Sequence, residues 1–161
     1  MINKITLAVI LIAVTVATGC KKSSNNNNTN NTACNGKNLC MKIDGIQFSE
    51  DAKWTVIPGG RRRILWENGT GAAYQNIEMD IYDTVSTTGS FTVSDNPGAG
   101  QAGFQYYTQS PLKNIQGVSG TVTLTSTANN MLTGTFVITA KDQTGSTVQI
   151  TDGNFVNVPK K

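Results

Sequence analysis

The side chains best suited to chemistry in this sequence include two acids in the middle of the chain, Glu78 and Asp80. They alternate with apolar residues, so on a β-strand they share one face, about 6–7 Å apart by the strand rise. Two carboxylates at a defined separation are what glycoside hydrolysis requires. Acids on the water-facing side of a strand also serve simply to keep a protein soluble, so the pair does not by itself predict an enzyme.

Three consecutive arginines form the basic cluster of the same region. On a strand, Arg61 and Arg63 share a face and Arg62 points the other way. A guanidinium fork matches a carboxylate or phosphate group, so Arg61, Arg63, Glu78 and Asp80 are the candidate ligand-binding residues. A basic run can also protect an edge strand from pairing with another chain, and this interpretation stays open.

The sequence contains no histidine. Ser-His-Asp and Cys-His catalytic arrangements are therefore impossible within this chain, as are zinc sites built on histidine and an imidazole general base. We predict no catalytic residues, no metal site and no cofactor. A carbohydrate-active hydrolase that relies on carboxylates alone remains the alternative function.

Aromatic residues and one loop could complete a binding site. The candidate stacking residues are Trp54, Trp66, Tyr74, Tyr82, Phe104, Tyr106 and Tyr107. Aromatic rings also build protein cores, so only an exposed group of them would indicate a sugar site. The glycine-rich segment from Asp95 to Gln101 is the best candidate for a lip over a site, because loops on rigid sheets commonly carry function.

The first of the three cysteines follows an apolar N-terminal run. Residues 5–16 are almost entirely apolar and follow a short head with one positive charge, which is the layout of a secretory signal. The run is shorter than the ~20 residues needed to span a bilayer. Ala17-Thr18-Gly19-Cys20 resembles the lipobox of bacterial lipoproteins, which implies a signal peptide over residues 1–19 and acylation of Cys20, for example by palmitate.

The segment after Cys20 reads as a tether. Residues 21–32 are Lys, Ser, Asn and Thr only, so no apolar burial can offset the entropy of ordering them. We predict a disordered tether over residues 20–39, with Lys21 and Lys22 favouring anionic headgroups. With Cys20 acylated, Cys34 and Cys40 are left as a pair that can form a disulfide in an oxidising compartment; two free thiols are the alternative.

Residues 40–158 show the period-two alternation of β-strands. We predict one all-β domain of about eight to ten short strands, either an antiparallel β-sandwich or a partly open β-barrel, followed by a basic tail at 159–161. Ala72–Tyr82 is predicted to be the longest strand. Asp44-Gly45 predicts a hairpin turn, and Asp152-Gly153 predicts a bulge or kink.

Two glycines of this domain, Gly120 and Gly134, fall at positions predicted to face inward. A bulky neighbour such as Trp54 or Trp66 could pack over each of them. All ten acidic residues but only seven of the thirteen basic residues lie in 40–158, so the domain is net acidic. Nucleic acid binding needs a basic stripe on the fold, and we do not expect it.

Several motifs resemble those of a family of small, uncharacterised all-β lipoproteins of Bacteroidota-type bacteria. They are Met41–Phe48 with its Asp-Gly turn, Gly89–Phe91, Ser119–Leu124, Leu132–Phe136 and Thr147–Phe155. The resemblance implies an all-β fold and an envelope location. The family has no assigned activity, so we expect a lipid-anchored binding or structural module, or an accessory subunit of an envelope complex.

The expected location is the bacterial outer membrane, with membrane lipid bound through Cys20 and a carbohydrate or an envelope protein as the further partner. Surface-exported lipoproteins of these bacteria often carry an acidic run after the lipidated cysteine, whereas Lys21-Lys22-Ser23-Ser24 is basic and neutral. We therefore expect the periplasm-facing leaflet. Asp83-Thr84-Val85 resembles the Asp-Ser/Thr-apolar acceptor for O-glycosylation in the same bacteria, which implies Thr84 as the attachment point.

Overall fold

The computed structural model describes residues 34–83 and 88–161, and ten strands of this part join in one sheet, so the predicted all-β fold is confirmed. Cys20 and Thr84 lie outside the described residues. The strands are β1 (Leu39–Ile43), β2 (Ile46–Glu50), β3 (Lys53–Ile57), β4 (Arg61–Asn68), β5 (Gln75–Ile81), β6 (Gly89–Val93), β7 (Gln101–Gln109), β8 (Leu112–Ser126), β9 (Met131–Lys141) and β10 (Thr147–Pro159). Two 3₁₀ turns, η2 (Gly71–Ala73) and η3 (Ala128–Asn130), connect strands. None of the helical segments in the described ranges has the length and apolarity of a membrane span.

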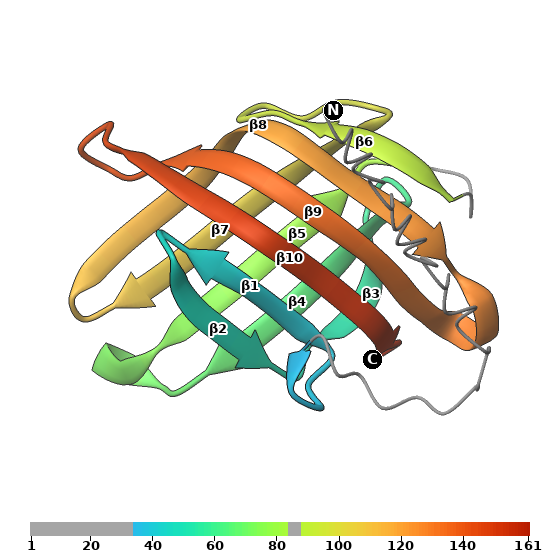
Figure 1. Cartoon of the computed structure of the whole chain (residues 1–161), viewed down its shortest axis with the longest axis horizontal. Coiled ribbons are helices and arrows are strands. Elements are labelled where there is room, and N and C mark those ends of the chain that lie inside the picture. The colour runs from blue at the N-terminus through green and yellow to red at the C-terminus, as the bar shows by residue number, and fades with distance from the viewer. Residues whose placement is uncertain (1–33, 84–87) are drawn as a thin grey trace, which may run out of the picture.

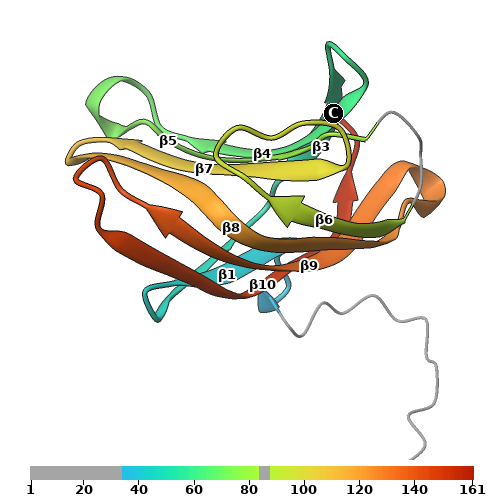
Figure 2. The same ribbon diagram turned by 90° about the horizontal axis from the view of Figure 1, so that it is seen from above.

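The sheet runs in the order β2-β1-β10-β9-β8-β6-β7-β5-β4-β3 and folds over on itself into two layers without closing into a barrel (Figures 1 and 2). One layer holds β3, β4, β5 and β7, and the other holds β1, β10, β9 and β6 (Figure 2). β8 belongs to both, because its first residues pair with β7 and its later residues pair with β6. A shift of register between Gly117 and Ser119 marks the change.

The far edge of the sheet is joined to the chain end. Trp54 of β3 forms an isolated parallel bridge with Lys160, and the Lys161 N–H donates to the Trp54 carbonyl at 2.8 Å. The Trp54 indole N–H also donates to the Asn130 carbonyl at 2.9 Å. Pro159 of the predicted basic tail is the last residue of β10, and Lys160 and Lys161 pair through their backbone with the edge strand β3.

The core lies between the two layers. The buried inward-facing positions of β4, β5 and β9 include Ile64, Trp66, Ile77, Met79, Ile81, Phe136 and Ile138. The glycine prediction was right in principle but named the wrong neighbours. A Cβ on Gly134 would overlap the ring of Phe155, and a Cβ on Gly120 would overlap the β9 backbone, so neither glycine lies under a tryptophan.

Strand lengths and directions differ from the prediction in two respects. The longest strand is β8 with 15 residues, not Ala72–Tyr82, whose first residues form η2 instead. β6 and β7 pair in parallel at two positions, so the sheet is mixed rather than purely antiparallel. The Asp44-Gly45 hairpin and the irregularity in β10 between Ile150 and Gly153 are both present as predicted.

Candidate functional site

The four candidate ligand-binding residues lie together on the outer face of the layer formed by β3, β4, β5 and β7. Cross-strand register places Arg63 opposite Asp80 and Leu65 opposite Glu78. Arg61 precedes Arg63 by two positions on β4 and so shares its face. The alternation in the sequence predicted each pair separately; the antiparallel pairing of β4 with β5 brings the two pairs together.

Arg63 is the centre of this cluster. Its Nε and Nη2 donate to the two carboxylate oxygens of Asp80 at 2.7 and 2.8 Å, and its Nη1 lies 2.9 Å from Oε2 of Glu78. Hydrogen bonding to Asp80 raises the pKa of the Arg63 guanidinium still further above its ordinary value, so the group is always charged. Asn76 Nδ2 donates to Oε1 of Glu78 at 3.0 Å. Both carboxylates therefore have fixed positions and a compensated charge.

The predicted water-facing position was wrong for Asp80, which is only 8% exposed. Arg63 lies across its carboxylate, and Nη1 of Arg61 lies 4.0 Å from its Oδ2. Glu78 is more open, with 24% of its side chain exposed. Strand alternation indicates only which face a residue occupies. Here the arginines of the neighbouring strand, rather than water, surround the acid.

The other two arginines divide between the faces as expected. Arg61 Nη1 donates to the Tyr82 hydroxyl at 2.9 Å, and its guanidinium lies 4.8 Å from the Tyr82 ring centroid, within the range of a cation–π contact. Arg62 points inward, where it is 6% exposed and forms a 2.7 Å ion pair with Asp83. Arg62 is thus part of the core boundary and not of the outer site.

The segment predicted to form a lip lies against the sheet beside this cluster. Gln116 Nε2 donates to a carbonyl of the loop at 3.0 Å, and a loop N–H donates to the Tyr82 carbonyl at 2.7 Å. Gly103 lets the loop approach, because a Cβ there would lie 3.1 Å from Cγ of Pro97. The loop is therefore fixed as one wall of a site on the outer sheet face.

These elements enclose an open pocket of about 310 Å³. It is lined by Arg63, Glu78 and Asp80 of the cluster and by Tyr82, Asn96 and Gln105 around them. The polar groups include donors and acceptors in the same small volume, which suits hydroxyl groups because each hydroxyl can do both. The volume is at the lower end of the range for small-molecule sites.

Gln105 and Gln116 were not predicted as site residues, and Asn96 was predicted only as part of the lip segment. Gln105 shares a strand face with Gly103, and an outward glycine in a strand can signal a close approach of other backbone. That signal was available in the sequence, but it does not say which loop approaches. The contribution of Gln116 depends on the pairing of β8 with β7, which local periodicity cannot supply.

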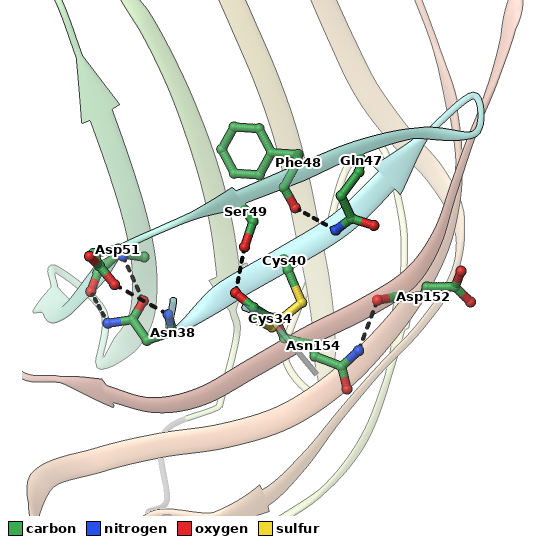
Figure 3. The surroundings of a disulfide bond; sticks show 10 residues. Cys34, Asn38, Cys40, Gln47, Phe48, Ser49, Asp51, Asp152 and Asn154 are labelled. Carbon is green, nitrogen blue, oxygen red and sulfur yellow. Dashed lines mark hydrogen bonds between the residues drawn. A yellow bond between two sulfur atoms is a disulfide. The ribbon is translucent and has the colours of Figure 1, made fainter. Parts of the chain in front are cut away.

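The remaining cysteines mark where the chain enters the domain (Figure 3). Cys34 and Cys40 are joined by a disulfide, with their Cα atoms 5.2 Å apart, and both are buried. The Asn38 side chain exchanges two hydrogen bonds with the Ala52 backbone at 2.7 and 3.0 Å. Ser49 Oγ donates to the Cys34 carbonyl at 2.7 Å. Residues 34–39 are thus ordered, not the end of a disordered tether, because the disulfide and these bonds hold them.

Within residues 34–83 and 88–161, no group of three or more His, Cys, Asp or Glu side chains is arranged to hold a metal ion. The acids of the cluster are bound instead by Arg63 and Arg61. No protein-family model, curated protein or solved structure matches this chain. What the site binds is inferred here from its geometry and charge.

Proposed function

We propose that this protein is a lipid-anchored binding module of the bacterial outer membrane that holds a neutral carbohydrate in the outer-face pocket. The observation that carries the proposal is the pocket itself: Arg63, Glu78 and Asp80 are fixed by one another, and polar side chains surround them. A preorganised set of donors and acceptors binds sugar hydroxyls without first paying to order its own side chains.

Charge compensation favours a neutral ligand over an anionic one. The strongest cation of the pocket, Arg63, already binds the oxygens of two carboxylates, so a ligand carboxylate or phosphate would have to displace them. A neutral sugar needs no such exchange. The Tyr82 ring and the methylene groups of Arg63 supply some apolar contact for the sugar ring.

The same contacts weigh against the hydrolase alternative. Glycoside hydrolysis requires one carboxyl group to carry a proton for the leaving group, whereas Arg63 donates to Asp80 and pairs with Glu78 at once. A protein partner would favour a contiguous apolar patch. Among the described residues, the exposed large apolar side chains are Ile46, Val56, Leu112, Met131 and Val137, which are distributed over β2, β3, β8 and β9.

A glycan array probed with the purified full chain tests the proposal. We expect binding to neutral glycans, and we expect Asn96→Ala to weaken it about three- to tenfold through loss of one or two hydrogen bonds. Asn96 lines the pocket, and only its backbone N–H takes part in a hydrogen bond within the described chain. Asn68→Ala, at the exposed end of β4, is the matched control and should bind as the wild type does. Absence of binding to every neutral glycan, or equal affinity of the two variants, would contradict the proposal.

A further inference from the structure

A second depression of about 260 Å³ lies on the same side of the layer that carries the pocket. Lys53 and Thr55 of β3 and Leu65 and Glu67 of β4 line it, at the outward positions of those strands. Trp54 and Trp66, which face the core and are only 8% and 7% exposed, contribute a small part of its surface. It is more apolar than the pocket over β5 and β7, and Leu65 is the apolar side chain among its outward-facing lining residues.

Strand register shows that the two depressions adjoin. Leu65 of the second depression is the direct cross-strand neighbour of Glu78 in the first, and side chains in such pairs are in contact range, about 5 Å apart at Cβ. One row of paired residues crosses all five strands, in the order Lys53, Leu65, Glu78, Gln105 and Gln116. From β3 to β8 this row covers four strand spacings, or about 19 Å.

The next row of paired residues across these strands is also polar, and it ends at a glycine on β7. Thr55 is paired with Arg63, Arg63 with Asp80, and Asp80 with Gly103. Within this row Arg63 stands between the depressions, and its ion pairs with Glu78 and Asp80 hold it against the sheet. The two volumes are thus parts of one shallow groove that runs across the strands rather than along them.

Groups of both signs line the second depression. In the second depression Asp51 is paired with Lys37 at 2.8 Å, and Glu67 accepts a hydrogen bond from the Tyr74 hydroxyl at 3.0 Å. Lys53 and Lys161 line the same depression as these acids. A long ligand that carried charge along its length would therefore meet groups of both signs, whereas a neutral chain meets hydrogen-bonding groups.

We propose that the two depressions are consecutive subsites for one neutral oligosaccharide that lies across β8, β7, β5, β4 and β3. This inference rests on the proposed carbohydrate function and adds the size and direction of the ligand. The pocket beside Asn96 binds hydroxyls at one end. The Leu65 side chain contacts the apolar face of a sugar ring at the other end.

Calorimetric titration of the full chain with neutral gluco- and manno-oligosaccharides of increasing length tests the inference. We expect the affinity for a hexasaccharide to exceed that for a disaccharide by at least about tenfold. Leu65→Lys, which places a charge at the junction of the depressions, should abolish this gain. Lys53→Ala, on an exposed position of the edge strand, should reduce the gain without threatening the fold. Val137→Lys makes the same apolar-to-cation change on exposed β9 and should have no effect.

The outcomes separate the two proposals. If disaccharide and hexasaccharide bind equally, and Asn96→Ala weakens both, the groove is wrong and the single-pocket function stands. The groove is wrong as well if Leu65→Lys weakens both lengths equally. If no neutral oligosaccharide of any length binds, the carbohydrate function itself fails and the groove fails with it.

Discussion

Arg63 connects strand pairing to site chemistry at the scale of single residues. It contacts both acids of the neighbouring strand, and those acids are 11% and 24% exposed in their side chains. A partly buried carboxylate that loses its partner is costly, whereas a fully exposed ion pair contributes about 0–1 kcal/mol. The cluster thus both shapes the pocket and contributes to the stability of the layer.

We expect Arg63→Ala to lower the free energy of unfolding by about 1–3 kcal/mol, intermediate between exposed and buried pairs. Urea unfolding followed by tryptophan fluorescence measures it. Lys42→Ala removes an exposed partner from Asp152, 44% and 64% exposed, and should change stability by less than about 0.5 kcal/mol. Arg63→Lys should recover only part of the loss, because an ammonium cannot reproduce the fork. Equal effects of Arg63→Ala and Lys42→Ala would mean that the cluster is not a stabilising element.

Prediction of the site from the sequence succeeded for residue types and faces but not for burial. Arg61, Arg63, Glu78 and Asp80 were singled out by chemistry and period alone, and the structure brings all four together. Their mutual pairing could not be predicted, because it depends on the register between β4 and β5. Nothing local in the sequence shows that Arg63 lies opposite Asp80 rather than one position away.

At the scale of elements, β9 and β10 are packed by two reciprocal glycine–phenylalanine pairs. Gly134 is opposite Phe155, and Gly153 is opposite Phe136. Each ring occupies the space that a Cβ on the opposite glycine would need, and the two rings stack with centroids 6.3 Å apart. The pairs fix the register of β9 and β10 next to the bulge, where an irregular strand would otherwise slip easily.

Gly134→Ala should be strongly destabilising for this reason. The added methyl would overlap both the Phe155 ring and the Thr123 carbonyl of β8, so two strands would have to move. We expect a loss of about 1–3 kcal/mol in the free energy of unfolding, as in other overpacked cores. Gly89→Ala in β6 is the control, since its Cβ would meet only Phe91 Cζ at 4.0 Å. Similar unfolding midpoints for the two variants would disprove the packing argument.

The turn between β9 and β10 predicts that the stability of the fold depends on pH. Oδ1 of Asp142 accepts hydrogen bonds from the Thr144 hydroxyl and from the N–H groups of Thr144 and Ser146. The Thr144 side-chain bond, foremost, lowers the pKa of Asp142 below its ordinary value of 3.8. Because the pKa of Asp142 is lower in the folded than in the unfolded protein, its carboxylate stabilises the fold fully above pH 3.8. This stabilisation is lost as the pH falls through the pKa of Asp142 in the folded protein.

The measurement is the stability difference between the wild type and Asp142→Ala as a function of pH. We expect the wild type to be the more stable protein at neutral pH and the difference to disappear in strong acid, below the folded pKa of Asp142. Asp142→Asn should lie between the two, since its carbonyl can still accept some of the bonds. A difference that stayed constant from neutral to acid pH would show that the turn does not depend on the carboxylate.

Elements with local signals were predicted well, and those set by distant pairing were not. The Asp44-Gly45 turn was predicted because Asp-Gly is a residue pair that favours the positive φ of a type I′ hairpin. In the structure both residues have positive φ, 48° and 81°. β8 was underestimated because residues 112–117 are mostly polar and exposed. They form a strand through pairing with β7 and not through an apolar alternation of their own.

At the scale of the whole molecule, the entry of the chain and the pocket over β5 and β7 lie on different layers. Cys34 and the disulfide adjoin β1 and β10, and the Val156 N–H donates to the Asn38 carbonyl at 2.8 Å. The pocket lies on the outer face of the other layer, which Figure 2 shows as β3, β4, β5 and β7 opposite β1 and β10. A domain attached to a membrane through residues 20–33 could thus present its site away from the attached layer.

Sidedness is a separate prediction, because the site could serve either face of the outer membrane. We propose the periplasm-facing leaflet, on the basis of the basic and neutral residues directly after Cys20. Brief protease treatment of intact cells should leave the protein whole, and the same treatment after permeabilisation should digest it. A known surface lipoprotein serves as the positive control. Digestion in intact cells at the rate of that control would place the protein on the cell surface instead.

The predicted lipid anchor is tested by Cys20→Ala, and Cys34→Ala serves as the control cysteine variant. If Cys20 carries the lipid, the variant should lose its incorporated radioactive palmitate and move from the membrane fraction to the soluble fraction. Cys34→Ala removes a thiol of the same type, but Cys34 is buried in the disulfide with Cys40 and lies outside the lipobox-like sequence. It should keep both the label and the membrane fractionation, although loss of a seven-residue disulfide loop should cost about 2 kcal/mol of stability.

Since the sheet and the groove do not involve Cys20, the soluble Cys20→Ala protein should still bind the oligosaccharides that the wild type binds. Retention of the label and of membrane association by Cys20→Ala would refute acylation at this residue.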